Sequence, residues 1–252
     1  METMTSTGMY IYAFLRAESI QGRTHTELAG IDGSPVSFVT VGAIAAATSA
    51  TEVKKIRPQR KNLAAHQDVV THLARNYDML PVAFGLIADD VQQVEQVLRS
   101  HQETLVEQIN RVSGHLEMTV NLRWSVPNVV QYFVDRYEAL SEARAAIAAG
   151  TATRDDQIAM GQYFEKLLNL EREQHTAKFL EVLNPFCKEI DVQPPREEAD
   201  CMRLACLIQR DSEEAFNQAV YRAASLFSDD FSISFNGPWP TYSFVKLALS
   251  LE

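Results

Sequence analysis

The chain has 252 residues, of which 46% are hydrophobic, so it can bury one large core or two smaller ones. At roughly 100–150 residues per domain, two domains are expected. The formal net charge is −10 and is unevenly placed, with −2 in residues 1–126 and −8 in residues 127–252. Because acidic surfaces repel phosphate groups, this composition argues against nucleic acid and anionic membranes as partners.

The cysteines and the N-terminus indicate a protein inside the cell. Cys187, Cys201 and Cys206 form no CxxC pair and no metal-knuckle spacing, which predicts reduced thiols in a cytosolic protein. The opening METMTSTG lacks the basic-then-apolar order of a secretory signal. No run approaches the roughly 18 apolar residues that span a bilayer, so no membrane partner is expected.

The first half of the chain shows strand and helix patterns in alternation. They predict strands at residues 9–15, 36–41 (continued after Gly42 by 43–48), 79–84 and 116–124. Helical spacing predicts helices at residues 59–76 and from Val91 to near Gly114, the second one favoured at its start by Asp89 and Asp90. Residues 1–8 are expected to be disordered and residues 16–35 to form a loop. Two helices on one sheet predict an N-terminal ferredoxin-like α+β sandwich over residues 9–125.

The second half begins with helices and ends with a smaller sheet. Helices are predicted at residues 129–149 and 155–183, separated by Gly150, and they form a long helical hairpin over residues 126–183. Strands are predicted at 186–192, 201–208 and 231–235, with a helix at 213–227 capped by Asp211 or Ser212. The predicted fold class is therefore α+β with two domains, the second one being a smaller α+β sheet over residues 184–252.

The most distinctive segment of the chain is Gly237-Pro238-Trp239-Pro240-Thr241-Tyr242-Ser243-Phe244. Each proline fixes its own φ, removes a backbone donor and favours extended geometry in the residue before it. We expect Gly237–Pro240 to be a stiff, extended rod that holds an indole and lies outside the middle of any sheet.

A second segment, Leu80-Pro81-Val82-Ala83-Phe84-Gly85, lies far upstream. In this order and at this separation, the two segments resemble the LPxxFG and GPWPPYSF signatures of the gas vesicle protein F/L family. The resemblance covers about Met9 to Leu247. Thr241 replaces the last proline of the second signature, and Ala83 stands where a basic residue is common.

The resemblance implies a minor structural or assembly component of gas vesicles, located at the vesicle within the cytoplasm. Such a protein contributes to buoyancy through contacts with the small hydrophobic shell protein and with other accessory proteins. It implies no enzymatic activity and no cofactor. It leaves open the oligomeric state and the inner or outer position on the shell.

The residues of the Gly237–Phe244 segment allow two interpretations. The ring of Trp239 can fill the C-terminal core, as large aromatic side chains usually do, or it can anchor a partner surface. Both hold if one face of the ring is exposed. As candidate partner-binding residues we take Pro238, Trp239, Pro240, Tyr242 and Phe244.

A basic run, Lys54 to Lys61, contains five positive side chains in eight residues and no acid. Its candidate contact residues are Lys54, Lys55 and Arg57. A solvated loop and helix start is the plainer interpretation, because the chain is acidic overall and the run lacks interleaved aromatic residues. The alternatives are a nucleic-acid patch or contact with an acidic protein surface, which the C-terminal half of a neighbouring copy could supply.

Signs of bond chemistry are sparse. Asp68/His72 and Glu171/His175 are each spaced i,i+4 on a predicted helix, but neither belongs to an HExxH motif, so solvated helix pairs are expected rather than metal ligands. Phosphate-loop, nucleophile-elbow and dinucleotide motifs are absent from the sequence. The alternative to a vesicle role is a small-molecule enzyme or sensor on a ferredoxin-like sheet, which would need a deep pocket with converging polar groups.

Overall fold

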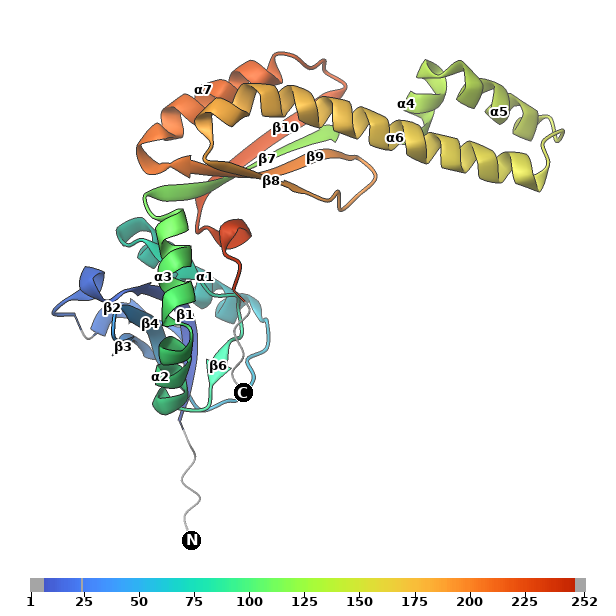
Figure 1. Ribbon diagram of the computed structural model, residues 1–252. Coiled ribbons are helices and arrows are strands. Elements are labelled where there is room, and N and C mark those ends of the chain that lie inside the picture. The colour runs from blue at the N-terminus through green and yellow to red at the C-terminus, as the bar shows by residue number, and fades with distance from the viewer. Residues whose placement is uncertain (1–6, 24, 248–252) are drawn as a thin grey trace, which may run out of the picture. The chain divides into compact units, whose positions relative to one another are not determined.

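A computed structural model describes residues 7–23 and 25–247, so most of the expected disordered start lies outside the described residues. The chain divides into two compact units: unit 1 is Met1–Glu117 with Pro238–Glu252, and unit 2 is Met118–Gly237. The chain leaves unit 1 within strand β7 (His115–Trp124) and returns to it within β10 (Phe231–Trp239) (Figure 1). The boundaries expected from the sequence, 9–125, 126–183 and 184–252, divide the chain differently.

Unit 1 is built on an antiparallel sheet whose central strand is β1. Its strands are β1 (Gly8–Arg16), β2 (His25–Ala29), β3 (Pro35–Val41), β4 (Ile44–Thr51), β5 (Met79–Pro81) and β6 (Ile87–Ala88). Their order is β2-β3-β4-β1-β5, and β6 also pairs with β1. Every side chain from Met9 to Leu15 is buried, as the run of apolar residues predicted for a central strand.

Two local expectations for this sheet were wrong. Residues 16–35 are not only loop, because β2 pairs with β3 there. The strand expected to continue past Gly42 instead turns back, and Val41 pairs with Ile44 in a tight hairpin. Gly42 adopts φ +57°, which glycine accommodates without steric cost, so the residue reverses the chain rather than interrupting one strand.

Three helices complete unit 1. They are α1 (Arg60–Asn76), α2 (Val91–Ser100) and α3 (Gln102–Val112). The Asp90 side chain caps α2 by accepting a hydrogen bond from the backbone N–H of Gln93. The helix expected to run from Val91 to Gly114 is broken at His101, which is non-helical. The apolar face of α1 packs on β1, with Val69, Val70 and Leu73 in the core.

Unit 2 contains the second antiparallel sheet. Its helices and strands after β7 are α4 (Val129–Arg136), α5 (Glu138–Ala148), α6 (Arg154–Leu183), β8 (Glu189–Gln193), β9 (Asp200–Gln209), α7 (Glu213–Ala224) and β10. The sheet order is β10-β7-β9-β8. This β-α-β-β-α-β succession with the first strand between the fourth and third is the ferredoxin-like arrangement. It therefore occurs over β7–β10, and not over residues 9–125 as expected.

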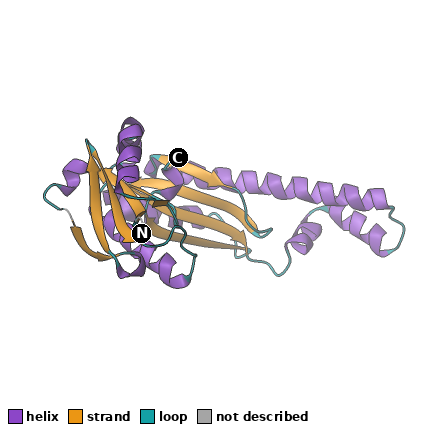
Figure 2. Cartoon of the chain, turned by 90° about the horizontal axis from the view of Figure 1, so that it is seen from below, coloured by secondary structure: helices purple, strands orange, loops and turns teal. Residues whose placement is uncertain are grey.

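The helical part of unit 2 follows the predicted hairpin with one change. The helix expected at 129–149 is interrupted at Tyr137, which is extended, and so forms α4 and α5. Helix α6 begins with a capping box in which Thr153 and Asp156 satisfy each other's backbone N–H groups. Figures 1 and 2 show α6 extending beyond the sheet, with α4 and α5 beside its N-terminal half.

Short 3-10 turns connect these elements, at Ala17–Ile20, Ile31–Gly33, Asn184–Phe186, Arg210–Ser212 and Tyr242–Phe244. Over the part of the chain that the structure describes, none of the helices combines the length and apolar character required to cross a bilayer. The fold class is α+β, as the sequence predicted, and the structure contains two antiparallel sheets.

Candidate functional site

The GPWP segment forms the end of an edge strand. Strand β10 runs through Gly237, Pro238 and Trp239, so the extended geometry expected from the prolines is present. Gly237 has φ +144°, a conformation that side chains with a Cβ rarely adopt. Because β10 lies at the edge of its sheet, Pro238 is compatible with strand structure.

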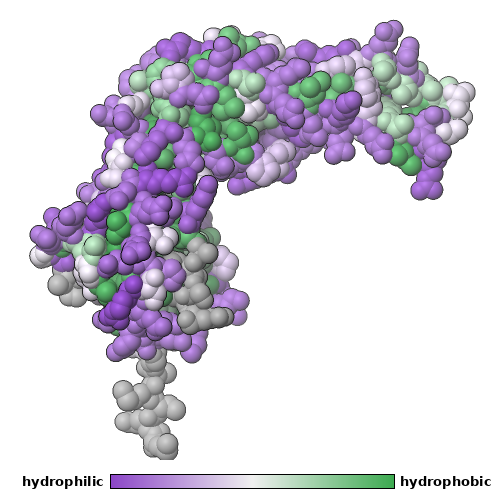
Figure 3. Space-filling view, in the orientation of Figure 1, coloured by the Kyte–Doolittle hydropathy of each residue, from purple (hydrophilic) through white to green (hydrophobic). Residues whose placement is uncertain are grey.

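The two tryptophans of the chain have opposite environments. Trp124 is 3% exposed, whereas Trp239 is 42% exposed and Pro238 beside it is also exposed. The ring of Trp239 therefore does not fill the hydrophobic core. On the face drawn in Figure 3, hydrophobic side chains are interspersed among hydrophilic ones.

The residues after Trp239 fold into unit 1. Pro240 and Thr241 are buried, and Phe244 is 1% exposed. Phe244 therefore belongs to the core and, in this fold, is not available to a partner, which corrects the expectation that its ring is a contact. Its burial fixes the position of the segment that carries Trp239.

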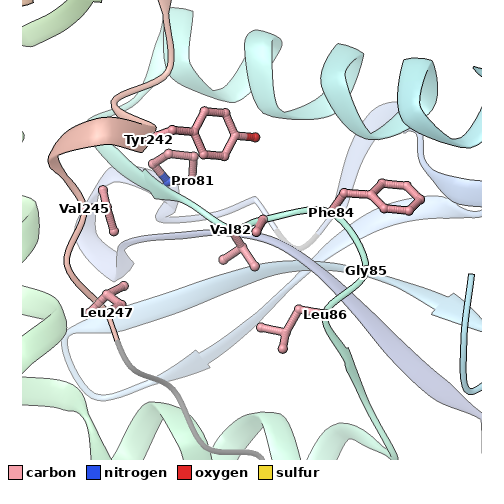
Figure 4. Close-up of a pocket in the computed structure, with 9 residues that line it drawn as sticks. Pro81, Val82, Phe84, Gly85, Leu86, Tyr242, Val245 and Leu247 are labelled. Atoms are coloured by element: carbon pink, nitrogen blue, oxygen red, sulfur yellow. The ribbon is translucent and has the colours of Figure 1, made fainter. Parts of the chain in front are cut away.

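Tyr242 joins the two distinctive sequence segments. Its ring lies beside Pro81, Val82 and Phe84 along an apolar cavity of about 430 Å³ (Figure 4). Val245 and Leu247 line the same cavity. Segments about 160 residues apart in the sequence thus meet in one place in unit 1, a proximity that the sequence did not predict.

A buried histidine stands at this junction. His66 of α1 lies with Nδ1 2.9 Å from the Tyr10 hydroxyl and with Nε2 3.3 Å from the Tyr242 hydroxyl. The Tyr10 hydroxyl oxygen accepts a hydrogen bond from the Gly85 N–H at 3.0 Å. Burial lowers the pKa of His66 to about 4, which favours the neutral imidazole.

A buried carboxylate holds the next residue of the segment. Glu117, 5% exposed, accepts hydrogen bonds from both the backbone N–H and the hydroxyl of Ser243, each at 2.8 Å. One carboxylate thus satisfies two donors of the C-terminal segment within unit 1. His66 and Glu117 were not among the site residues predicted from sequence. The available signals were two tyrosines in a buried strand, whose hydroxyls need partners, and a lone acid in an apolar strand.

The cavity offers apolar contact rather than acid–base chemistry. Among its described lining residues the one titratable group is the Tyr242 hydroxyl, and burial raises the pKa of that group to about 12. A phenol with so high a pKa stays protonated at neutral pH. The converging polar groups that a small-molecule enzyme would need are not found among these lining residues.

The basic run lies on the exposed connection between β4 and α1. Lys54, Lys55 and Arg57 are all exposed, and Lys54 lies 3.3 Å from Asp89. Such an exposed ion pair contributes little to stability. Within residues 7–23 and 25–247, Lys54 and Lys61 each form an ion pair, and none is found for Lys55 or Arg57.

The second i,i+4 pair is not the solvated helix pair we expected. Glu171 lies 3.1 Å from His175, and their side chains are 15% and 12% exposed. The Tyr137 hydroxyl donates to the other Glu171 oxygen at 2.6 Å, and the His175 ring packs against Phe231. These contacts tie α6 to the α4–α5 junction and to β10. In the described part of the chain, no group of three or more potential ligand residues is placed to hold a metal ion.

These features define the class as an α+β protein that carries an exposed indole between two prolines at the end of a strand. The residues after the indole are held by buried contacts with His66 and Glu117. A family model described as gas vesicle synthesis protein GvpL/GvpF matches residues 8–246. The chain belongs to the GvpL/GvpF family.

Relatives with established names support the same family. Gas vesicle protein F of Dolichospermum flosaquae is 27% identical, over 88% of this chain and 91% of that protein. Gas vesicle protein F of Streptomyces sp. is 26% identical, over 94% and 100%. Gas vesicle protein L2 of Halobacterium salinarum is 25% identical, over 95% and 91%. These relatives carry the names of gas vesicle proteins and not of enzymes.

Two crystal structures share the fold. The structure of GvpF from Anabaena sp. PCC7120 superimposes with a TM-score of 0.83 at 23% identity, covering 96% of this chain and all of that one. The structure of GvpF from Microcystis aeruginosa gives a TM-score of 0.82 at 25% identity, covering 95% and 99%. The arrangement of elements described above is thus that of gas vesicle protein F.

Proposed function

We propose that this protein is a non-enzymatic component of gas vesicle formation that binds the small hydrophobic shell protein and other accessory proteins at the vesicle within the cytoplasm. Membership of the GvpL/GvpF family supports the vesicle role. A shell subunit apolar enough to exclude water is prone to aggregate before assembly. A partner with a rigid aromatic anchor could cover that apolar surface or seed its ordered addition.

The observation that carries the proposal is the exposure of Trp239 on a fixed backbone. An indole that is 42% exposed and lies between two prolines offers a large apolar surface at a low cost in conformational entropy. Tryptophan is among the residues that dominate binding energy at protein interfaces. We assign contact to Trp239 and Pro238, while Pro240, Tyr242 and Phe244 hold that contact in place.

The test is the affinity of Trp239→Ala for the shell protein, measured by quantitative pull-down. We expect a loss of about tenfold or more, because truncating an interface hot spot typically costs about 2 kcal/mol. Tyr163→Ala is a matched control: Tyr163 is also a large aromatic residue, it is 39% exposed, and it lies on α6.

Unchanged affinity of Trp239→Ala in a folded protein would reject this contact. The wider role is tested by deleting the gene in a vesicle-forming host and scoring refractile vesicles by microscopy. Normal vesicles in the deletion strain would remove the support for a role in assembly. If a gene carrying Trp239→Ala fully restores vesicles in that strain, the role in assembly stands and only the assignment of Trp239 as a contact fails.

The basic run is the second proposed contact, with an acidic surface of a partner. Changing Lys54, Lys55 and Arg57 together to Glu should weaken binding to the partner at low salt. Raising the ionic strength should lower the affinity of the wild type until it approaches that of the variant. Equal salt dependence of the wild type and the triple variant would contradict this contact.

A further inference from the structure

Strand β10 leaves one edge of the unit 2 sheet open. In the order β10-β7-β9-β8 it is a terminal strand, so β7 pairs with it on one side and, among the described strands, none pairs with it on the other. Ser232, Ser234 and Asn236 are exposed, while Phe231, Ile233 and Phe235 are half-buried. The strand therefore has one polar face, one apolar face and a free side.

The hydrogen bonds of β10 show which backbone groups face outward. The carbonyl of Asp230 accepts from the Ser125 N–H at 2.6 Å, and the carbonyl of Asn236 accepts from the Thr119 hydroxyl at 3.3 Å. Along an antiparallel strand, the backbone N–H and C=O groups of successive residues point to opposite sides of the strand. The backbone groups of the even-numbered residues from 230 to 236 therefore point toward β7. Ile233 and Phe235 consequently direct their N–H and C=O groups to the free edge.

The first seven residues of this edge lack the charges and prolines that usually prevent strand pairing, and the proline of β10, Pro238, follows them. Residues 231–237 contain no charge and no proline. At the opposite edge of the same sheet, the shorter strand β8 carries Glu189 and Asp191. Charged or short edge strands discourage pairing with another chain, whereas a long uncharged edge invites it. Beside β10, Tyr221 of α7 is 61% exposed and its ring contacts Phe235, so apolar surface adjoins the free edge.

The sequence of the edge is palindromic. Phe231-Ser232-Ile233-Ser234-Phe235 reads the same in both directions about Ile233. We infer that β10 pairs antiparallel with β10 of a second copy of this chain, across a two-fold axis at Ile233. Phe231 then lies opposite Phe235 of the second copy, Ser232 opposite Ser234, and Ile233 opposite itself. Aromatic pairs and serine pairs are favourable when directly opposite, and the surface is self-complementary as a two-fold interface requires.

The outward backbone groups fit this register. With Ile233 on the axis, its N–H and C=O groups exchange two hydrogen bonds with those of the second Ile233, and each Phe235 N–H donates to the opposite Phe231 carbonyl. Asp230 falls opposite Asn236 and not opposite another acid. The two four-stranded sheets thereby form one continuous sheet, with no like-charge pair between the two copies of residues 230–236.

The test uses the full chain and the solvent-facing serines. In S232K/S234K, the lysine introduced at position 232 lies opposite the lysine introduced at position 234 of the other copy, so repulsion should raise the dimer dissociation constant at least tenfold. Sedimentation equilibrium at low salt measures mass against that of the 28.3 kDa monomer. S232T/S234T is the matched control, since threonine keeps the hydroxyls and favours strands, and it should dimerise like the wild type.

A charge exchange separates loss of pairing from loss of folding. S232E/S234E should also be monomeric alone, and mixing it with S232K/S234K should restore a dimer of one chain of each kind. A wild type that stays monomeric up to millimolar concentration, or a lysine variant that dimerises as well as the wild type, would overturn the inference. A mixture of the two variants that remains monomeric would overturn the register.

Discussion

At the scale of single residues, Thr241 stands where the family signature has a third proline. Its φ of −75° already suits proline. Its buried hydroxyl has no hydrogen-bond partner among the described residues, which costs free energy in the folded state. Threonine at this position is thus compatible with the backbone but not required by it.

We predict that Thr241→Pro stabilises the protein by about 0.4–1 kcal/mol, because proline restricts the unfolded chain at a position whose native geometry it can adopt. Urea denaturation checks the free energy of unfolding. Thr241→Val is the control: it removes the hydroxyl and keeps the shape, so it isolates the hydroxyl's contribution. A loss of stability in Thr241→Pro would mean that the backbone around residue 241 does not accommodate the ring.

His66 links stability to pH. Its pKa is about 4 in the folded protein against 6.5 for the free side chain, because burial disfavours the charged form. As pH falls below 6.5, the unfolded chain takes up this proton first, so folding loses stability until about pH 4. The full loss from this group is on the order of 3 kcal/mol.

We predict that His66→Gln lowers the stability at pH 7, because it alters the hydrogen bonds with Tyr10 and Tyr242, and that its deficit against the wild type shrinks as pH is lowered to 5. Urea denaturation of both proteins at the two pH values measures the difference. Other groups titrate equally in both proteins and cancel in the comparison. Parallel pH profiles would show that His66 is not the group responsible.

At the scale of elements, strands and helices with strong local patterns agree with the sequence. The apolar run of β1, the period of α1 and the alternation of β10 each reflect one face or both faces being buried. The missed elements have weak local signals. Strand β2 owes its structure to pairing with β3, and the breaks at His101 and Tyr137 occur inside patterns that remain helical on both sides.

Helix α6 offers a direct test of capping. We predict that Thr153→Ala costs about 1 kcal/mol, because it removes the side-chain half of a capping box at the start of a helix whose first turns are exposed. Hydrogen exchange of the first turns should rise. Ser212→Ala is the control, since Ser212 occupies the N-cap position of α7 without a side-chain cap hydrogen bond. Equal effects of the two substitutions would contradict the capping argument.

At the scale of the whole molecule, the chain returns to unit 1 after completing unit 2. Truncation after Gly237 removes the contacts of Tyr242 with His66 and of Ser243 with Glu117, leaving a buried carboxylate without these two donors. We predict that residues 7–117 lose protection from hydrogen exchange while residues 118–237 keep it, because unit 2 is contiguous in sequence.

Truncation after Leu247 is the matched control for this experiment, because it retains Tyr242, Ser243 and Phe244. Mass spectrometry after hydrogen exchange resolves the two units separately. Loss of protection throughout the chain in the first truncation would show that the units fold as one. Retention of protection in residues 7–117 would show that the C-terminal segment is not needed to complete unit 1.

The sequence by itself determined the α+β class, most strands and helices, the family and the extended GPWP segment, because period, proline geometry and short motifs are local properties. Only the tertiary structure decided that β7 to β10 form the ferredoxin-like sheet, that Phe244 is buried while Trp239 is exposed, and that His66 and Glu117 hold the C-terminal segment. Those outcomes depend on which distant segments pack together, and burial in a shared core leaves no mark in the spacing of neighbouring residues.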